Sequence, residues 1–287
     1  MIRNDRKQFP VATVLANAQT ALLLLPPGFG ITDGGTMVTA ARVSQLSEIE
    51  PLREEYREEM NCQIVHDSIH RRPGWTREYA LELDGATVGY GSVAIAGPWR
   101  DTPALYEFYV QREQRMQTFD LFASLLGACG AEIIETQSNA PMLTVILHTF
   151  ARNIRAESIL FRDAFRTSLA PAGADFRAAA AADTEALRRQ GLDEEASWLV
   201  TLNGEIAGAG GVLYHYNPPY GDIYMAVAEP FRRKGLGTYL AQELKAVCRA
   251  GTKVPAARCN VGNLASRRTL QRSGFVPCGN IVAGDLA

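Results

Sequence analysis

A short run of cations and glycines has the composition of an anion-binding loop. Residues 232–237 read Arg-Arg-Lys-Gly-Leu-Gly, between a β-like run at 223–227 and an amphipathic helical pattern that starts at Leu236. The first N–H groups of a helix have no partner within the helix, and the helix dipole favours an anion there. Gly235 and Gly237 have no Cβ to keep a phosphate away from the backbone. The loop therefore predicts a phosphate or pyrophosphate ligand.

A second group of reactive side chains lies directly upstream, at 215–224, where the chain reads His-Tyr-Asn-Pro-Pro-Tyr-Gly-Asp-Ile-Tyr. Its prolines and its glycine predict a stiff loop that leads into the strand. Side chains alternate between the two faces of a strand, so Asp222 and Tyr224 share one face. His215 or Asp222 can accept a proton through water, and Tyr224 can donate one. The alternative, that these residues only pack or form structural hydrogen bonds, stays open.

Two motifs at a defined spacing resemble those of a known superfamily. The loop at 232–237 is neither a Walker A motif nor a Rossmann G-x-G-x-x-G motif. Its R-x-x-G-x-G form, after a strand that ends in Val, resembles the acetyl-CoA signature of the GNAT superfamily of N-acetyltransferases. Downstream, a segment that begins at Asn263 and ends in Gly274-Phe275 resembles the second motif of that family. The resemblance covers residues 176–287, and the alternative is a glycine that merely joins a strand to a helix.

The resemblance implies an acetyl-CoA co-substrate and an α+β fold, with three layers around a mixed, mostly antiparallel central sheet. In the family, two strands splay apart and the pantetheine arm pairs with the exposed strand backbone. The residues implied in binding are Met225, Ala226 and Val227 for pantetheine, Arg232, Arg233, Lys234, Gly235, Leu236, Gly237 and Thr238 for pyrophosphate, and Asn263 for pantetheine or a neighbouring loop. A solvated charge run is the weaker alternative for the three cations.

The chain departs from the family pattern at two positions that bear on catalysis. The family often has a Tyr four residues before the Gly-Phe pair as the acid, where this chain has Leu270. It also often has an acidic residue on the strand before the Asn, where residues 257–260 read Ala-Arg-Cys-Asn. We therefore assign the acid and base roles to Tyr224, Asp222 and His215, with the Val227 N–H as the oxyanion donor. A nucleophilic Cys259 is not expected, because direct attack by an amine needs no covalent intermediate.

The function implied by these residues is acetyl-CoA-dependent N-acetyl transfer. A primary amine of a small molecule or peptide would attack the thioester directly. The departures above keep a second hypothesis open, in which the chain is a catalytically silent CoA-binding regulatory or scaffold protein. A third hypothesis is an O-acyl or longer-acyl transferase. The sequence does not identify the acceptor.

Composition and charge limit the other classes. The chain has 287 residues, of which 47% are hydrophobic and 21% charged, and a net charge of −2, as in globular proteins. Such a charge offers no global field for nucleic acid. The five cysteines have no C-x-x-C spacing, which favours reduced thiols in a cytoplasm over a disulfide or zinc framework. His66 and His70 are four residues apart, but no matching third ligand is evident, so we expect no metal site.

The start of the chain is expected to lie outside the folded part. An apolar run at 11–25 is interrupted by polar residues and is too short to span a bilayer, so no membrane partner is expected. We expect residues 1–36 to form a poorly ordered extension, and Met37 is a candidate natural start.

A series of expected elements occurs twice along the chain. In the first half, two strands around Asp84-Gly85 precede a strand at 104–110, a helix at 119–126 and a strand at 131–137. In the second half, two strands around Asn203-Gly204 precede a strand at 222–227, helices at 236–249 and 264–273, and a strand between them at 257–261. A further helix is expected at 44–60, with Ser47 as its N-cap. We infer two tandem GNAT-like units, at 37–165 and 166–287, joined by a connection at 154–169.

Alignment of the two series predicts a degenerate first unit. Setting Val110 against Val227 places Arg115 opposite Arg232, and Thr118 and Asp120 opposite the two glycines of the loop. These side chains cover backbone that a phosphate would need, so pyrophosphate is expected to bind only the second unit. The first unit would wall the acceptor cleft or mediate formation of a homodimer. The alternative is two unrelated domains with a similar order of elements.

Overall fold

The computed structural model describes residues 37–286, and the extension expected at 1–36 lies outside them. The strands in the described part are β1 (Thr39–Ser44), β2 (Thr76–Leu83), β3 (Ala86–Ala94), β4 (Ala104–Val110), β5 (Ile133–Gln137), β6 (Ala151–Asp163), β7 (Ala174–Ala178), β8 (Trp198–Leu202), β9 (Glu205–Leu213), β10 (Tyr220–Val227), β11 (Val254–Asn260) and β12 (Phe275–Leu286). The α-helices are α1 (Leu46–Met60), α2 (Thr118–Cys129), α3 (Pro141–Phe150), α4 (Thr184–Arg189), α5 (Leu236–Ala250) and α6 (Leu264–Arg272). The 3-10 helices are η2 (Asp67–Arg71), η3 (Gly97–Trp99), η4 (Arg112–Gln117), η5 (Ala181–Asp183) and η6 (Glu229–Phe231).

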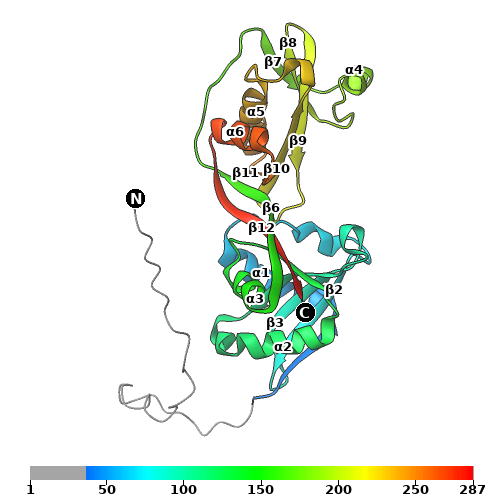
Figure 1. The fold of residues 1–287 in the computed structure, drawn as a ribbon, viewed down its shortest axis with the longest axis vertical. Coiled ribbons are helices and arrows are strands. Elements are labelled where there is room, and N and C mark those ends of the chain that lie inside the picture. Colours follow the sequence, from blue (N-terminus) through cyan, green and yellow to red (C-terminus); the bar gives the residue numbers. More distant parts are fainter. Residues whose placement is uncertain (1–36, 287) are drawn as a thin grey trace, which may run out of the picture. The chain divides into compact units, whose positions relative to one another are not determined.

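The strands of residues 37–286 join into one mixed, mostly antiparallel sheet of 12 strands (Figure 1). Their order is β1-β2-β3-β4-β5-β12-β6-β11-β10-β9-β8-β7. Only the β4–β5 and β10–β11 neighbours run parallel. If β1 is matched with β7, β2 with β8, and so on to β6 with β12, the same order is obtained when the sheet is read from its other end. Each matched pair of neighbours is also parallel or antiparallel in the same way. The two ends of the sheet therefore have the same strand order on either side of the β12–β6 pair.

The central pair joins the two halves of the chain. β6 pairs with β11 of the second half, and β12 pairs with β5 of the first half. The connection expected at 154–169 was wrong over most of its length, because residues up to Asp163 form β6. β12 was not predicted at all. The first part of β6 is exposed and rich in charged residues, so it lacks the apolar alternation that signals a strand.

Both parallel pairs separate soon after they begin. β10 is paired with β11 only over Tyr220–Asp222, although β10 continues to Val227. β4 is paired with β5 only at Ala104 and Leu105. In each half the carboxyl end of a central strand therefore has a hydrogen-bonding edge without a neighbouring strand, which is where the helix that follows it begins.

Helices cover both faces of the first half of the sheet. Leu121 and Phe122 of α2 and Leu143 of α3 pack with Phe108 in one buried cluster. Ile49 and Tyr56 of α1 pack with Tyr90 and Tyr109 in another. Phe108 and Tyr109 are adjacent in β4 and point to opposite faces, so α1 lies on the face opposite to α2 and α3. In the second half, Leu236, Leu240 and Leu244 of α5 and Leu270 of α6 share one core with Ile223 of β10.

The hairpins were predicted correctly, and the start of the first helix was not. Asp84-Gly85 and Asn203-Gly204 have positive φ at both residues and join antiparallel strands, as predicted. The helix expected at 44–60 begins at Leu46, and Gln45, not Ser47, is its N-cap. The Ser44 hydroxyl contacts Glu48 and not a free backbone N–H, so no side chain caps this helix. 

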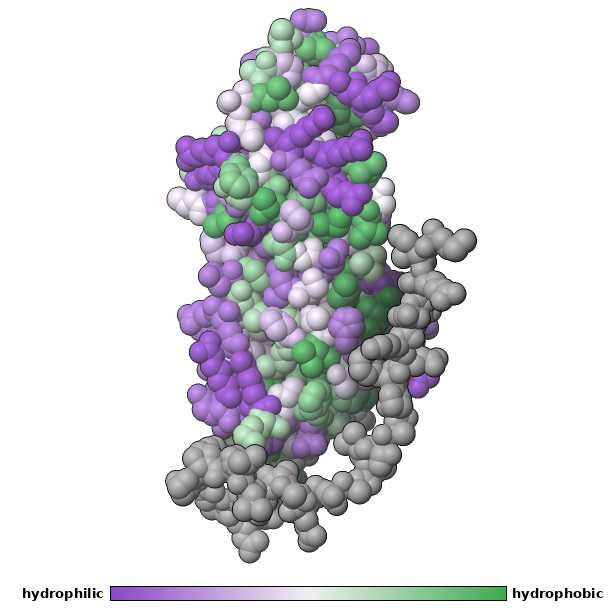
Figure 2. Space-filling view, turned by 60° about the vertical axis from the view of Figure 1, so that its left-hand side comes forward, coloured by the Kyte–Doolittle hydropathy of each residue, from purple (hydrophilic) through white to green (hydrophobic). Residues whose placement is uncertain are grey.

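Hydrophobic and hydrophilic residues are interspersed on the face of the molecule in Figure 2. None of the helices within 37–286 is both long and apolar enough to cross a membrane. The cysteines Cys62, Cys129, Cys248, Cys259 and Cys278 are free thiols.

Candidate active site

The loop between β10 and α5 presents a run of free backbone donors. Chain reversal uses η6 and then two left-handed residues, Arg233 at φ +64° and Gly235 at φ +81°. Tyr239 donates the first intrahelical hydrogen bond of α5, to the Gly235 carbonyl at 3.1 Å. The six consecutive N–H groups from Arg233 to Thr238 have no acceptor within residues 37–286. An L-residue such as Arg233 rarely adopts a positive φ, and such strained conformations cluster at ligand sites.

The two loop glycines also lie close to neighbouring side chains. A Cβ on Gly235 would lie 3.1 Å from Leu169 Cδ2, and one on Gly237 would lie 3.2 Å from Thr269 Cγ2. These side chains come from the segment before β7 and from α6. The sequence suggested that glycine allows a phosphate to approach the backbone here. The structure adds a second reason, which is the limited space beside Leu169 and Thr269. Substitution of either residue combines an effect on packing with an effect on the loop.

The three cations of the loop lie at the surface around the free donors. Arg232 donates Nε to the Val227 carbonyl at 3.2 Å, which fixes the turn at the end of β10. The Lys234 ammonium lies 5.3 Å from the centre of the Phe231 ring, within the range of a cation–π contact. Arg232, Arg233 and Lys234 are exposed, so their charges raise the local positive potential without loss of their own hydration.

The open edge of β10 leads to this loop. Ala228 N–H bonds the Ala207 carbonyl at 3.0 Å, and hydrogen bonds alternate along an antiparallel ladder. The N–H groups of Met225 and Val227 therefore point away from β9, toward the side from which β11 has diverged. Ala226 is exposed and Met225 and Val227 are half-buried, so this edge is accessible.

Tyr224 stands on the face of β10 that carries no core residues. Its ring lies on Gly211 of β9, where a Cβ would come within 2.8 Å of Cε1. Burial, and then the nearby Asp193 carboxylate, raises the pKa of Tyr224 to about 12. The phenol therefore remains protonated at neutral pH and can act as a proton donor but not as a base. Asp193 was not a candidate from the sequence, because only the fold brings it beside β10.

Asp222 and His215 lie together, apart from the loop glycines. His215 Nε2 is 3.0 Å from Asp222 Oδ2, and Arg258 Nε is 3.4 Å from the same oxygen. The other oxygen, Oδ1, is buried and has no hydrogen-bond partner within the described part of the chain. Arg258 was missed by the sequence reasoning, which saw only the absence of an acid at that point of the strand. The two candidate bases thus share one ion-pair cluster at the base of the split between β10 and β11.

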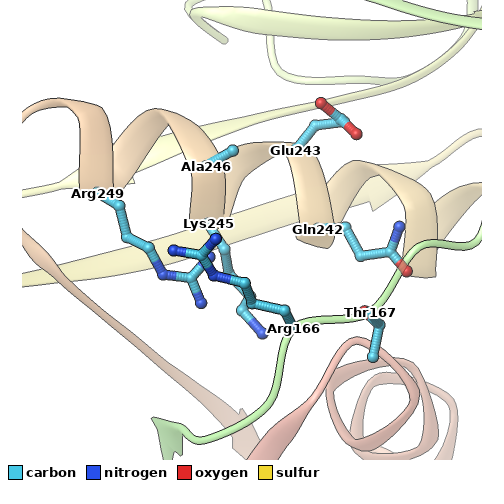
Figure 3. Close-up of a pocket in the computed structure, with 7 residues that line it drawn as sticks. All are labelled: Arg166, Thr167, Gln242, Glu243, Lys245, Ala246 and Arg249. Atoms are coloured by element: carbon cyan, nitrogen blue, oxygen red, sulfur yellow. The ribbon is translucent and has the colours of Figure 1, made fainter.

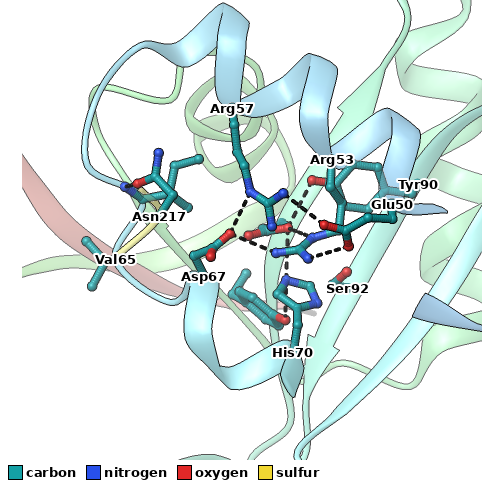
Figure 4. A network of polar contacts seen from close by, with 12 residues as sticks. Glu50, Arg53, Arg57, Val65, Asp67, His70, Tyr90, Ser92 and Asn217 are labelled. Carbon is teal, nitrogen blue, oxygen red and sulfur yellow. Dashed lines mark hydrogen bonds and ion pairs between the residues drawn. The ribbon is translucent and has the colours of Figure 1, made fainter. Parts of the chain in front are cut away.

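Backbone and side chains of the first half hold the loop that carries His215. Asn217 is buried, and its Oδ1 accepts from the Ile64 N–H at 2.6 Å while its Nδ2 donates to the Cys62 carbonyl at 3.2 Å. The His215 carbonyl accepts from the Ser68 N–H at 3.1 Å. The Tyr220 hydroxyl donates to the Asn61 carbonyl at 3.0 Å. Figure 4 shows Asn217 beside this segment. The contacts join residues more than 140 apart in the sequence, and no local pattern signals them.

The residues of the second motif have structural roles. Asn263 is the N-cap of α6, and its Oδ1 accepts from the Ser266 N–H at 3.0 Å. Leu270 lies in the core of the second half, so no acid stands at that position. Cys259 is buried beside it, and burial raises the pKa of its thiol, which disfavours a thiolate nucleophile.

The corresponding loop of the first half differs in backbone conformation. The 3-10 helix η4 runs directly into α2, and from Gln114 on its N–H groups are used within the turn, as in the bonds of the Gln114 N–H to the Gln111 carbonyl and of the Thr118 N–H to the Arg115 carbonyl. Arg115 donates Nε to the Val110 carbonyl at 3.1 Å, five residues earlier, as Arg232 does to Val227. Arg115 also pairs with Glu59 of α1 at 2.6 Å. Thr118 and Asp120 lie at the start of α2, as the sequence alignment placed them.

A buried polar network stabilises the first half (Figure 4). The His70 ring lies 2.9 Å from Glu78 and 3.0 Å from Glu107. Arg53 lies 2.9 Å from Asp67 and 3.4 Å from Glu107. Burial opposes the charged imidazolium, but Glu107 and Glu78 outweigh it and raise the pKa of His70 to about 9. Glu107 occupies the position in β4 that Tyr224 occupies in β10, so buried ion pairs replace an accessible phenol there.

A cavity of about 320 Å³ on the outer side of α5 is a less suitable site (Figure 3). Lys245 donates to the Phe165 and Ser273 carbonyls at 2.7 Å and 2.6 Å, and Arg249 pairs with Asp163. Lys245 also lies 2.8 Å from Asp163, so both of these cations already have partners within the protein. No group of three or more His, Cys, Asp or Glu residues within 37–286 is arranged to hold a metal ion.

Comparison with known proteins identifies this architecture. A sequence model of the Acetyltransferase (GNAT) family matches residues 161–275, which contain the β10–α5 loop and α6. No curated protein matches the chain in sequence. The family match supports the GNAT family for the second half of the chain.

Solved structures show the same fold over most of the chain. An acetyltransferase of the GNAT family from Colwellia psychrerythraea superposes with a TM-score of 0.68 at 15% identity, over 86% of this chain and 99% of its own. A GCN5-related N-acetyltransferase from Sphaerobacter thermophilus gives 0.52 at 16% identity, over 86% and 94%. A tandem GNAT protein from the clavulanic acid biosynthesis pathway gives 0.52 at 14% identity, over 86% and 97%. At these identities the likeness establishes the fold.

Proposed function

We propose that this GNAT-fold protein is an N-acetyltransferase that moves an acetyl group from acetyl-CoA to a primary amine. The observation that carries the proposal is the run of six free N–H groups from Arg233 to Thr238 at the start of α5, beside the open edge of β10. Such donors at a helix start bind phosphate oxygens, and three exposed cations add attraction for a diphosphate. The match of the GNAT family model to this part of the chain supports the same assignment.

The open edge of β10 would hold the rest of the co-substrate. The N–H of Met225 would bind the pantetheine arm, and the N–H of Val227 would donate to the oxyanion that forms on the thioester carbonyl. Asn263 would act indirectly, as the cap that fixes the start of α6. Tyr224 lies on the same strand, so its hydroxyl would be the candidate donor to the leaving sulfur.

The proposed reaction needs two proton transfers. The amine must lose a proton before or during attack, and the Asp222–His215 pair would accept it through water. The new C–N bond forms as the C–S bond breaks, and the leaving thiolate would take a proton from the Tyr224 hydroxyl. The raised pKa of Tyr224 keeps its hydroxyl protonated at neutral pH, so it can donate a hydrogen bond to the leaving sulfur, and it also makes the phenol a weaker acid.

The proposal includes two tandem GNAT-like units, at 37–165 and 166–287, which exchange their β6 and β12 strands. The matching strand order on both sides of the β12–β6 pair supports it, as do the equivalent contacts of Arg115 and Arg232. The first unit would not bind the diphosphate but would wall the acceptor cleft.

Hydrogen bonds of the first unit to Asn217, His215 and Tyr220 support its role as a wall of the acceptor cleft. Substitution Asn217→Ala is expected to raise KM for the amine with little change in the Kd of CoA.

Release of free thiol from acetyl-CoA tests the function. A panel of polyamines, aminoglycosides, aryl amines and peptide N-termini is screened, and the product is checked by mass for one added acetyl group. Acceptor-dependent thiol release supports the enzyme. Tight calorimetric binding of CoA without release for any acceptor or acyl chain length would instead identify a silent CoA-binding protein.

A further inference from the structure

The first half contains an apolar cavity of about 360 Å³. It lies where β4 has left β5, between the end of α1 and the starts of α2 and α3. Its walls are Tyr56, Met60, Phe108, Phe119, Met142 and Leu143. Small-molecule pockets span about 300 to 1,000 Å³ and are mostly apolar, so both size and lining fit a ligand.

The backbone of β4 adds a free donor to this cavity at Phe108, which is one of the residues that line it. Gln111 N–H bonds the Val88 carbonyl at 2.9 Å, and the ladder alternates from there. The N–H groups of Phe108 and Val110 therefore point away from β3, on the side where β4 has no partner strand beyond Leu105. Both residues are buried. Buried N–H groups without a protein acceptor require another partner, and a carbonyl oxygen is the simplest one.

The charges around the cavity are already matched. Glu59 pairs with Arg115 at 2.6 Å and with Arg112 at 3.3 Å, and Glu55 accepts hydrogen bonds from Tyr109 and Gln111. The two acids and two arginines sum to zero charge, so the mouth does not select for an ion. The rim itself is apolar, with Phe119 and Val145 about half exposed. These features favour an uncharged ligand.

We propose that this cavity binds a neutral, mainly apolar small molecule that carries a carbonyl acceptor. The apolar part fills the space between Phe108, Met142 and Leu143, and the carbonyl oxygen accepts from the N–H of Phe108. This site is independent of the proposed acetyl transfer, because it lacks the free helix-start donors of the β10–α5 loop. The first half is then a ligand-binding unit as well as a wall for the second.

Binding of a neutral fluorescent ketone tests this site. The full chain is titrated with 6-propionyl-2-(dimethylamino)naphthalene in the absence of CoA, and a saturable blue shift with one dye per chain is expected. Butyrophenone should displace the dye at roughly 3- to 10-fold lower concentration than butylbenzene, which lacks the acceptor oxygen. If both compounds displace the dye at the same concentration, the ligand does not accept a hydrogen bond from β4 and that part of the proposal is wrong.

Two variants and a matched control locate the dye. Met142→Trp fills the cavity, and Val145→Glu places a charge at its rim; each is expected to weaken dye binding at least about tenfold. Val43→Glu changes a valine that is also exposed but lies on β1, away from the cavity, and should have no effect. Thermal unfolding confirms that each variant is folded. Unchanged dye affinity in both cavity variants, or no saturable binding by the wild type, would overturn the proposal whether or not the protein transfers acetyl groups.

Discussion

The loops after β10 and after β4 occupy equivalent places in the sheet but differ in whether their backbone N–H groups are hydrogen-bonded. Each follows a central strand that has separated from its parallel neighbour, and each contains an arginine that bonds the carbonyl five residues earlier. After β4, the chain coils at once into η4 and continues as α2. After β10, only three residues form a 3-10 turn, and the left-handed Arg233 and Gly235 leave the following N–H groups free.

Under the proposed function, backbone conformation decides which loop can bind an anion. The sequence suggested that side chains at Thr118 and Asp120 block the first loop. The structure adds that the N–H groups of η4 from Gln114 on are used in their own turn, so removal of those side chains would not free them. Accessibility and hydrogen-bonding capacity are separate requirements, and only the second loop meets both.

The largest effect is expected from a charge placed among the free donors. Gly237→Glu should lower CoA affinity at least about 100-fold, because several charge-assisted hydrogen bonds are lost or opposed. A carboxylate at a helix start stabilises the helix, so the variant should remain folded. Calorimetric titration with CoA measures the change. Gly237→Ala is the matched control, since it shares the close contact with Thr269 but adds no charge; an equal loss in both variants would assign the effect to packing.

A smaller effect on activity is expected from substitution of Tyr224 in β10, the position that Glu107 occupies in β4. Tyr224→Phe should lower kcat by roughly 100-fold, because the leaving thiolate loses its acid, and should leave the Kd of CoA unchanged. With a pKa of about 12, the hydroxyl stays protonated up to pH 10. Titration of Tyr224 should therefore cause no loss of wild-type activity at any pH below 10. Steady-state kinetics with the amine found by screening provide the readout. Tyr214→Phe, an exposed tyrosine beyond the end of β9, is the control, and an unaltered kcat in Tyr224→Phe would contradict the assignment.

The sequence could predict the local parts of this comparison. Both hairpins, the position of the β10–α5 loop and the alternation of Asp222 and Tyr224 follow from turn residues and periodicity. The contacts of Arg258 and Asn217 could not be predicted, because they join distant segments. The β6–β12 pairing also has no local signal, since β6 lacks apolar alternation over its exposed part. Loop glycines suggested phosphate approach, and only the structure revealed their packing against Leu169 and Thr269.

The buried network of the first half predicts that the stability of the protein depends on pH through His70. The pKa of His70 is raised from its ordinary 6.5 to about 9, so its contribution is complete below pH 6.5 and is lost as the pH rises through 9. The free energy of unfolding should fall by up to about 1.4 kcal/mol per pH unit in that window through this proton. His70→Gln leaves Glu78, Glu107 and Arg53 without the imidazolium. It should lower the free energy of unfolding by about 3 kcal/mol at pH 6 and by less at pH 9.5.

Denaturant unfolding at several pH values measures that difference. His148→Gln is the control, because His148 is exposed on α3. A constant gap between wild type and His70→Gln from pH 6 to 9.5 would show that His70 is not charged in the folded protein.

The smallest effect sharpens the comparison between the two loops. Thr118→Gly combined with Asp120→Gly removes the side chains at the positions that align with Gly235 and Gly237 of the second loop. We expect CoA to bind with an unchanged stoichiometry of one per chain, because the N–H groups of η4 stay bonded. A second CoA per chain in calorimetry would show that side-chain blockage alone had closed the first loop.

Amide hydrogen exchange with and without CoA tests the central claim most directly. The N–H groups of Arg233–Thr238 are unpaired, so they should exchange rapidly in the free protein and slow markedly at saturating CoA. Those of Arg112–Asp120 should not change. Unaltered exchange at Arg233–Thr238 in the CoA-saturated protein, or protection of Arg112–Asp120 in their place, would contradict the account.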